Sequence, residues 1–282
     1  VYLNILFGWE NTLERQIINS VIVIALLFCI NMFSAKLGGI FQRVTVVVKM
    51  IPLILFGIVG LIFGNPGEAW TASQAAGTSG TWLQAIPAVL YAFDGWIIAT
   101  SISHEIKDSK RNLYLALIIS PLIILALYLM YFIGMSSYMG PNQIIAMGNE
   151  HLYAAATKMM GTELGAKLVL ILVIISVLGV DNGMILGFIR LPYSLALRKM
   201  MPDSEKYAVI HPKHGVSLRS GFFAFALSMI WVIAHYFTQK YIWLKGQHDI
   251  SEIAMVVNYI LFLTLYAAVI KLAIKGEIHS IW

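Results

Sequence analysis

Charge and cysteine are both scarce in this sequence of 282 residues. Charged residues make up 12% of the chain, whereas soluble domains contain about 25%. The one cysteine, Cys29, lies in an apolar run, so no disulfide can form within the chain. Because hydrophobic residues make up 59% of the sequence, the shortage of charge excludes a large soluble core and predicts an all-α integral membrane protein.

Motifs of soluble enzymes are absent too. The sequence contains no Walker motif, no dinucleotide-binding fingerprint and no serine nucleophile elbow. The net charge of +5 is not gathered in one basic domain, so no nucleic-acid partner is expected. A starting methionine and a basic leader are missing at Val1, and we expect the chain to begin within a longer protein. We expect neither an enzyme nor a bound cofactor or metal.

Long apolar segments are what the sequence does contain. Each is long enough to cross a bilayer as a helix that rises about 1.5 Å per residue. The seven segments cover residues 17–35, 44–64, 83–103, 113–137, 167–188, 220–237 and 253–274. We expect them to form one membrane domain over residues 1–282. Residues 150–160, between the fourth and fifth segments, are compatible with a short helix and equally with a plain surface loop.

The basic residues predict the orientation of these segments. Of the 19 Lys and Arg residues, 13 fall on one set of connections and five on the opposite set. Basic residues favour the cytoplasmic side, so we expect the N-terminus of this chain outside and the C-terminus inside, in a multi-pass protein of the plasma membrane. The 13 are Lys36, Arg43, Lys107, Lys110, Arg111, Arg190, Arg198, Lys199, Lys206, Lys213, Arg219, Lys271 and Lys275.

A carboxylate interrupts the third apolar segment. Asp94 lies near its middle, followed by Gly95 and preceded by Pro87. Placing a carboxylate at that depth costs about 2.5–3.5 kcal/mol or more, and broken helices occur at membrane depth where the freed backbone lines a cavity or contacts other protein. We therefore predict that the chain loses its helical winding here and binds a polar solute. The alternative is a carboxylate that only fixes the packing of helices.

Aromatic residues surround this break. Tyr91, Phe93 and Trp96 can gate or wall a pocket as a set, although ordinary packing explains any single ring.

Other polar residues lie within the remaining spans. Asp181 and Asn182 form a second polar interruption, for which function and structure are equally plausible. Lys49 can snorkel to the cytoplasmic face or act as a fixed internal cation. Asn258, in the last span, can bind a neighbouring helix or a ligand.

Several stretches resemble the amino acid–polyamine–organocation transporters, above all their L-type amino-acid transporter branch and the bacterial serine/threonine-exchanger-like permeases. The resemblance covers nearly the whole chain, and its most specific part is the motif at the break with the stretch that follows it. The stretches are residues 91–96, 105–113, 42–53, 182–190 with Ala196–Arg198 and Pro202, and Asn258-Tyr259.

The resemblance implies a twelve-helix fold whose first ten helices form two inverted repeats of the LeuT type. The seven spans then match the fourth to tenth family helices. Residues 17–64 would hold the last two helices of the first repeat, and residues 83–274 the complete second repeat. Three family helices before this chain and two after it are missing, so we expect a truncated transporter.

The same resemblance implies roles for individual residues. Tyr91 corresponds to an aromatic gate, and the carbonyls of Tyr91 and Asp94 to the groups that hold a substrate ammonium. Lys49 corresponds to a lysine that takes the place of a sodium ion in sodium-independent relatives. Asn258 corresponds to a polar position near the substrate side chain. Met184 departs from the small or hydroxyl residue of several relatives, which leaves the polar partner of Lys49 open.

These observations predict a sodium-independent amino-acid permease or exchanger that works by alternating access. Its substrate would contact Tyr91, Phe93, Asp94, Gly95, Trp96 and Asn258, while Lys49, Asp181 and Asn182 would take part in gating or coupling. Asp94 can pair directly with a cationic amino acid, or stay within the protein and leave a small neutral substrate. No disulfide-linked heavy subunit is expected, because the outer loops lack cysteine. The alternative class is a seven-helix membrane sensor or receptor.

Overall fold

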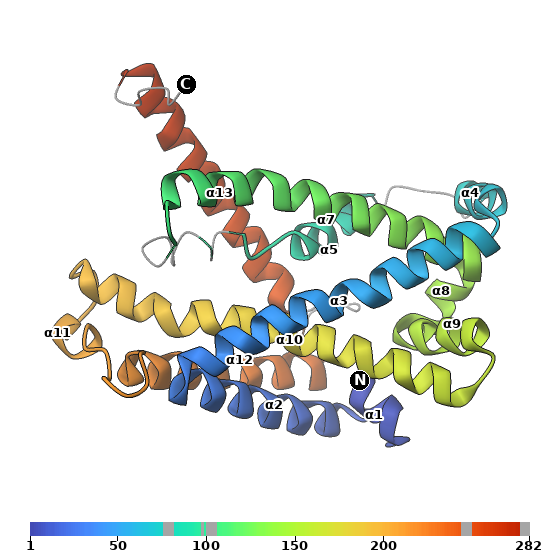
Figure 1. The fold of residues 1–282 in the computed structure, drawn as a ribbon, viewed down its shortest axis with the longest axis horizontal. Helices are drawn as coiled ribbons and strands as arrows, with labels where there is room; N and C mark the ends of the chain where they lie inside the picture. Colours follow the sequence, from blue (N-terminus) through green and yellow to red (C-terminus); the bar gives the residue numbers. More distant parts are fainter. Residues whose placement is uncertain (76–81, 97–98, 100–105, 244–249, 277–282) are drawn as a thin grey trace. The chain divides into compact units, whose positions relative to one another are not determined.

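The computed structural model describes residues 1–75, 82–96, 99, 106–243 and 250–276 (Figure 1). All regular structure in these residues is helical, and six of the helices are long and apolar enough to cross a membrane. They confirm a multi-pass, all-α membrane protein. These six are α2 (Leu13–Phe33), α3 (Ala35–Phe63), α7 (Ser109–Met139), α10 (Glu163–Leu197), α12 (Leu218–Lys240) and α13 (Ile250–Ile274).

The remaining expected span, residues 83–103, begins with a shorter helix. This helix, α5, covers Trp82–Ala92. Residues 97–98 and 100–103 of the expected span lie outside the described part of the chain.

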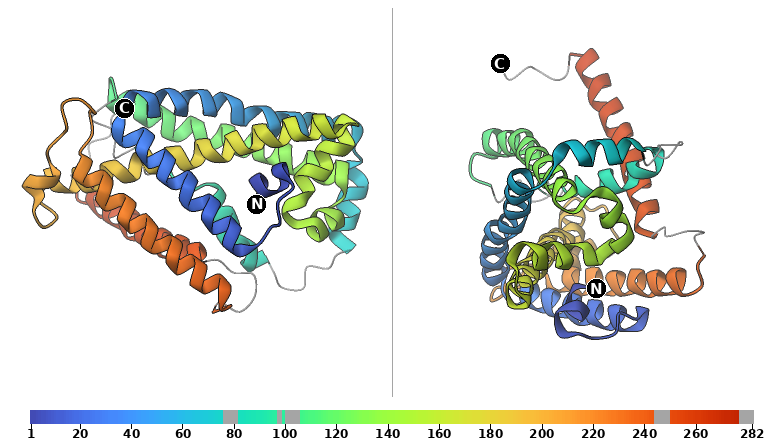
Figure 2. Two further views of the ribbon diagram at one scale, coloured as in Figure 1. Left: turned by 90° about the horizontal axis from the view of Figure 1, so that it is seen from below. Right: turned by 90° about the vertical axis from the view of Figure 1, so that its right-hand side faces the viewer.

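Contacts divide the chain into two units, each of which has its own packing. The first unit comprises residues 1–78 and 95–232, and the second comprises residues 79–94 and 233–282. In the first unit α3 packs along α7 on one side and against α10 on another, and α2 also contacts α10. The helices of this unit are seen from two further sides in Figure 2. In the second unit α5 packs against α13.

Helices α2 and α3 meet at a corner of one residue, Ser34. Its backbone N–H donates to Ile30 O at 3.0 Å and ends α2, while its Oγ accepts from Leu37 N–H at 3.2 Å and caps the start of α3. The Nδ1 of His214, in the connection before α12, lies 2.8 Å from the carbonyl oxygen of Phe33. One residue therefore ends α2 through its backbone N–H and caps α3 through its side chain, and a distant loop contacts the last carbonyl of α2.

Glycine allows α3 and α7 to touch backbone to backbone. A Cβ placed on Gly60 would lie 2.0 Å from the carbonyl oxygen of Gly134, and one placed on Gly134 would lie 2.5 Å from the carbonyl oxygen of Gly57. Membrane helices associate by such close approach, because lipid supplies no hydrophobic drive between them. The three glycines therefore fix the separation of α3 and α7.

Short helices cover one end of the first unit. Residues 150–160, for which a helix and a loop were equally compatible with the sequence, form α9 (His151–Met160). Ala155 and Ala156 of α9 pack in a buried cluster with Phe56 of α3 and Met135 of α7. The other short elements are α1 (Tyr2–Phe7), α4 (Pro66–Ala75), α8 (Pro141–Met147), η2 (Gly148–Glu150) and α11 (Ser204–Tyr207).

A serine of α12 inserts into the hydrogen-bond ladder of α10. The Ser220 hydroxyl donates to Ile189 O at 2.6 Å and accepts from Tyr193 N–H at 3.0 Å, so it bridges two groups that a regular helix would pair directly. Pro192 lies within this turn and lacks its own N–H. Insertions of this kind open a helix locally, and this one joins the start of α12 to the last part of α10.

Candidate functional site

Helix α5 ends at Ala92, and Phe93–Trp96 form a turn. Gly95 has a φ of 95°, a conformation that L-residues rarely adopt. The N–H of Asp94 donates to Tyr91 O at 3.2 Å, three residues back, instead of to Leu90 O as in an α-helix. The predicted loss of helical winding is therefore confirmed at Phe93–Trp96.

The second unit brings Asp94 and Asn258 together. The Nδ2 of Asn258, on α13, donates to Oδ1 of Asp94 at 3.4 Å. The neighbouring Tyr259 donates its hydroxyl to Leu90 O at 3.3 Å, which is the carbonyl that the break releases from its α-helical partner. Two residues predicted for the substrate site from separate spans are thus neighbours. Tyr259, which the sequence singled out only through the resemblance, completes the contact.

The aromatic residues at the break differ in exposure. The side chain of Tyr91 is 62% exposed, whereas Phe93 and Trp96 are half-buried. Tyr91 is therefore the most exposed aromatic residue of this segment.

In the first unit, Asn182 lies at the centre of a buried polar network between α2, α3 and α10. It is 0% exposed. Its Oδ1 accepts from Asn31 Nδ2 at 2.7 Å, and its Nδ2 donates to Gln42 Oε1 at 2.9 Å and to Gly38 O at 3.3 Å. This network joins three helices, and α10 remains helical through it. Asn182 thus finds its hydrogen-bond partners on the neighbouring helices α2 and α3, and α10 does not break.

Small residues determine how α3 and α10 approach each other. A Cβ on Gly179 would lie 2.5 Å from the Cβ of Thr45, and one on Gly183 would lie 2.9 Å from Nε2 of Gln42. Lys49 follows Thr45 by one turn of α3 and is half-buried. Asp181 is also half-buried. In the part of the chain that the structure describes, these two residues form no ion pair with each other.

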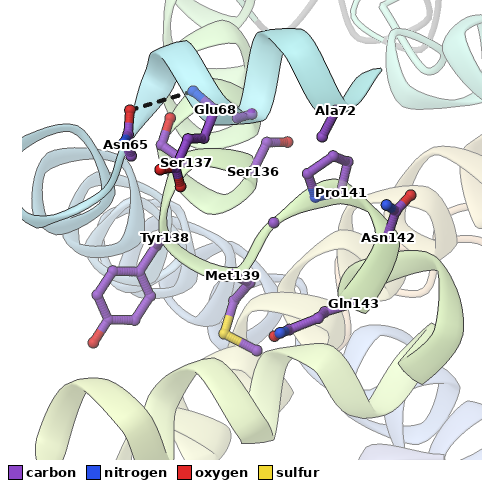
Figure 3. Close-up of a pocket in the computed structure, with 12 residues that line it drawn as sticks. Asn65, Glu68, Ala72, Ser136, Ser137, Tyr138, Met139, Pro141, Asn142 and Gln143 are labelled. Atoms are coloured by element: carbon purple, nitrogen blue, oxygen red, sulfur yellow. Dashed lines mark hydrogen bonds between the residues drawn. The ribbon is translucent and has the colours of Figure 1, made fainter. Parts of the chain in front are cut away.

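A cavity of about 330 Å³ lies elsewhere in the first unit, at the end of α7 (Figure 3). Glu68 and Ala72 of α4 line one side, and Ser136 of α7 and Asn142 and Gln143 of α8 line the other. The N–H of Asn65 donates to Ser137 O at 2.9 Å and joins α4 to α7 beside the cavity. None of the predicted site residues lines it. No group of His, Cys, Asp and Glu in the described residues could hold a metal ion.

The polar partners of the predicted residues were harder to find from the sequence. Asn31 lies in the first expected span and is 1% exposed. It was not proposed as a site residue from the sequence, and Asn258 was the one carboxamide proposed outside the fifth span. The same signal, a lone carboxamide in an apolar run, applies to Asn31. Ser220 gave no signal, because serines are common at the ends of spans.

Comparison with known proteins relates almost the whole chain to one family. Residues 2–279 match the family described as amino acid permease. The serine/threonine exchanger SteT of Bacillus subtilis is 29% identical over 274 residues, which cover 96% of this chain and 59% of that protein. The b(0,+)-type amino acid transporter 1 of Mus musculus is 26% identical over 45% of this chain and 28% of its own length.

A third relative has another named substrate. The methylthioribose transporter of Bacillus subtilis is 23% identical over 71% of this chain and 42% of its own length. The chain spans little more than half, or less, of the length of these relatives. Since the family match runs through both spans that meet at Asp94 and Asn258 and through the network around Asn182, the chain belongs to the amino acid permease family.

Proposed function

We propose that the protein containing this chain is a sodium-independent amino-acid permease or exchanger of the plasma membrane, working by alternating access. The observation that carries the proposal is the break after α5, where a left-handed glycine follows a carboxylate bound to another span. Unwound backbone at membrane depth offers peptide groups to the charged ends of a small solute. The serine/threonine exchanger and the b(0,+)-type amino acid transporter among the relatives support amino acids as that solute.

The residues of the break then have distinct roles. The substrate ammonium binds the carbonyls of Tyr91 and Asp94, because the end of a helix carries partial negative charge. Tyr91 O already accepts one hydrogen bond, from Asp94 N–H, and a carbonyl oxygen has a second lone pair. The Tyr91 ring closes over the substrate, Phe93 and Trp96 wall the pocket, and Gly95 holds the turn.

The contact between Asp94 and Asn258 supports a small neutral substrate. One carboxylate oxygen of Asp94 accepts from the Asn258 amide, so this charge has a partner inside the protein. A carboxylate held in this way is less available to the cationic side chain of a substrate. We therefore propose serine- or alanine-sized amino acids, with Asn258 beside the substrate side chain.

Lys49 would replace a coupling sodium ion. It is a half-buried cation on α3, one turn beyond the position where Thr45 packs on Gly179. A fixed ammonium removes the need for a metal cation at that place. Asn182 positions α3 through Gln42 and Gly38. Asp181 stays a prediction, because none of its described contacts supports a role.

The topology proposed from the basic residues places the N-terminus of this chain outside and its C-terminus in the cytoplasm. One membrane domain would include both the helices of residues 17–64 and those of residues 83–274.

The test is uptake of labelled amino acids by the protein at its full natural length in liposomes. We expect serine uptake that is equal in sodium and choline buffers and that falls about tenfold in Tyr91→Ala, because removing an aromatic ring that contacts a ligand can cost more than about 1 kcal/mol of binding free energy. Tyr114→Ala, at an exposed tyrosine of α7, is the matched control and should leave uptake unchanged. Uptake that requires a sodium gradient, or a Tyr91→Ala protein with normal uptake, would overturn the proposal.

A second variant tests the substrate class. Asp94→Asn keeps the shape of the side chain and its contact with Asn258 but removes the charge. We expect serine uptake to stay within about threefold of the unchanged protein, because an exposed or internally satisfied charge contributes little to a neutral ligand. Efficient arginine uptake that disappears in Asp94→Asn would instead show direct pairing with a cationic substrate.

A further inference from the structure

We propose that the connection between α10 and α12 is a binding surface for anionic phospholipid headgroups. This segment, residues 198–219, runs from the end of α10 through α11 to the first two residues of α12 and extends at the lower left of Figure 1. It contains five exposed basic side chains against two acidic ones, and one of the acids, Asp203, is already paired with Lys206 at 3.1 Å. The five are Arg198, Lys199, Lys206, Lys213 and Arg219.

Exposed apolar side chains lie between these basic residues along the chain. Met200 is 67% exposed, Val209 63% and Ile210 45%, and all three lie outside the membrane-crossing helices. Cationic side chains beside exposed apolar ones are typical of surfaces that lie at the boundary between headgroups and acyl chains. Inorganic phosphate offers nothing for the apolar side chains to contact, so this combination favours a lipid over a free anion.

The segment is folded, so little ordering is needed before a lipid binds. The Ser217 hydroxyl donates to Tyr207 O at 2.7 Å, and His211 N–H donates to Val216 O at 2.9 Å. The ring of Tyr207 packs edge-on against Phe223 of α12. The insertion of Ser220 into α10 holds the two ends of the connection together. The basic and apolar side chains are therefore presented on a surface that already has its shape.

The position of the segment also fits this role. It joins two helices that cross the membrane, so it lies at a bilayer surface, and the uneven distribution of basic residues places it on the cytoplasmic side. Anionic lipids give that leaflet its negative potential, and each Lys or Arg close to it strengthens binding by about fivefold. The proposal requires that α10 and α12 cross the membrane with this segment on the cytoplasmic side, and it is independent of what the protein transports.

The test is a titration of the protein at its full natural length, in uncharged detergent, with fluorescent phosphatidylglycerol and with fluorescent phosphatidylcholine. We expect phosphatidylglycerol to bind at least tenfold more tightly. The triple variant Arg198→Gln, Lys213→Gln, Arg219→Gln should lose most of this preference. The triple variant Arg15→Gln, Lys167→Gln, Lys240→Gln removes the same charge from the other predicted side and should keep it.

A third variant separates lipid from free anion. Val209→Ser with Ile210→Ser should weaken phosphatidylglycerol binding severalfold, while inorganic phosphate should fail to displace the lipid. Displacement by inorganic phosphate without any effect of this variant would identify a phosphate site and contradict the proposal. Equal binding of the two lipids, or equal losses in the two triple variants, would overturn it as well. Melting temperatures close to that of the unchanged protein show that each variant is folded.

Discussion

Two polar segments in apolar helices have opposite effects on the backbone. At Phe93–Trp96 the helix α5 has ended and the chain turns, whereas α10 continues as a helix through Asp181, Asn182 and Gly183. In both places a carboxamide from another span supplies a partner, Asn258 for Asp94 and Asn31 for Asn182. A polar residue within a span therefore does not by itself determine whether the helix breaks.

The difference lies in what the neighbouring glycines do. Gly179 and Gly183 have helical backbones and leave room for Thr45 and Gln42, so the partners of Asn182 reach it from the side. Gly95 instead has a φ of 95°, and its Cβ direction is open apart from Met184 at 3.6 Å. Glycine provides space in the first case and a backbone conformation in the second. The first arrangement keeps α10 continuous, and the second turns the chain after α5.

Among substitutions in these two segments, Asn182→Leu should have the largest effect, and it should appear in the free energy of unfolding. It removes an amide that binds Asn31, Gln42 and Gly38 and leaves their polar atoms buried. We expect a loss of about 2–3 kcal/mol in the free energy of unfolding, which is the cost of buried groups without partners. Unfolding in mixed detergent measures it, with Asn31→Leu and the double variant completing a cycle. A change below about 0.5 kcal/mol would show that the network does not hold these helices together.

Gly95→Ala should affect transport more than folding. Its φ of 95° strains an L-residue whatever the space, at a cost of about 1–3 kcal/mol. We expect amino-acid uptake to fall about tenfold, since 1.4 kcal/mol corresponds to one decade. Gly39→Ala, at a helical glycine of α3 with nothing within 4 Å of its Cβ direction, is the control and should change little. Normal uptake in Gly95→Ala would mean that the turn at residues 93–96 is not required.

Asn258→Leu is the counterpart of Asn182→Leu at the break. The contact with Asp94 is long, at 3.4 Å, and the side chains are only partly buried. We expect less than about 1 kcal/mol of lost stability, close to the average for polar contacts between membrane helices. Uptake should decrease relative to the unchanged protein while folding is retained, as judged by elution and melting in detergent. A stability loss as large as that of Asn182→Leu would remove the distinction between a binding segment and a packing segment.

Asp181→Asn should give the smallest effect. Asp181 is half-buried, and no described contact connects it to Lys49. We expect uptake to stay within about twofold across pH 5–8, because the substitution breaks no ion pair with Lys49. A pH optimum that shifts in this variant would instead give Asp181 a part in proton coupling.

Hydropathy was enough to predict the six membrane-crossing helices found in the described residues, because a bilayer requires long apolar helices whatever the tertiary packing. The break at Asp94 was predicted from Pro, Asp and Gly within one span, but α10 also contains these three residue types and continues as a helix, so composition alone did not separate the two cases. The six membrane-crossing helices are longer than the spans expected for them: α3, for example, begins at Ala35, nine residues before the expected start at Val44. Polar residues such as Arg43 can continue a helix beyond the apolar core of the membrane.

Pairing between helices was not predictable in the same way. Nothing in a single sequence indicates that Asn31 binds Asn182, or that Ser220 inserts between Ile189 and Tyr193. These contacts depend on the register of helices far apart in the chain. Asn258 and Asp94 were selected for separate reasons, and their contact is a finding of the structure. The roles of Lys49 and Asp181 remain predictions, because their described surroundings do not distinguish the alternatives.

The corner at Ser34 limits how the protein can move. One residue separates α2 from α3, and the carbonyl of Phe33 is in contact with His214. The two helices are therefore connected too tightly to tilt independently. Any displacement of α3 that opens or closes a passage must carry α2 with it and must pull on the loop before α12. The three connected segments would then respond together, and a rigid link engineered between any two of them should arrest the third.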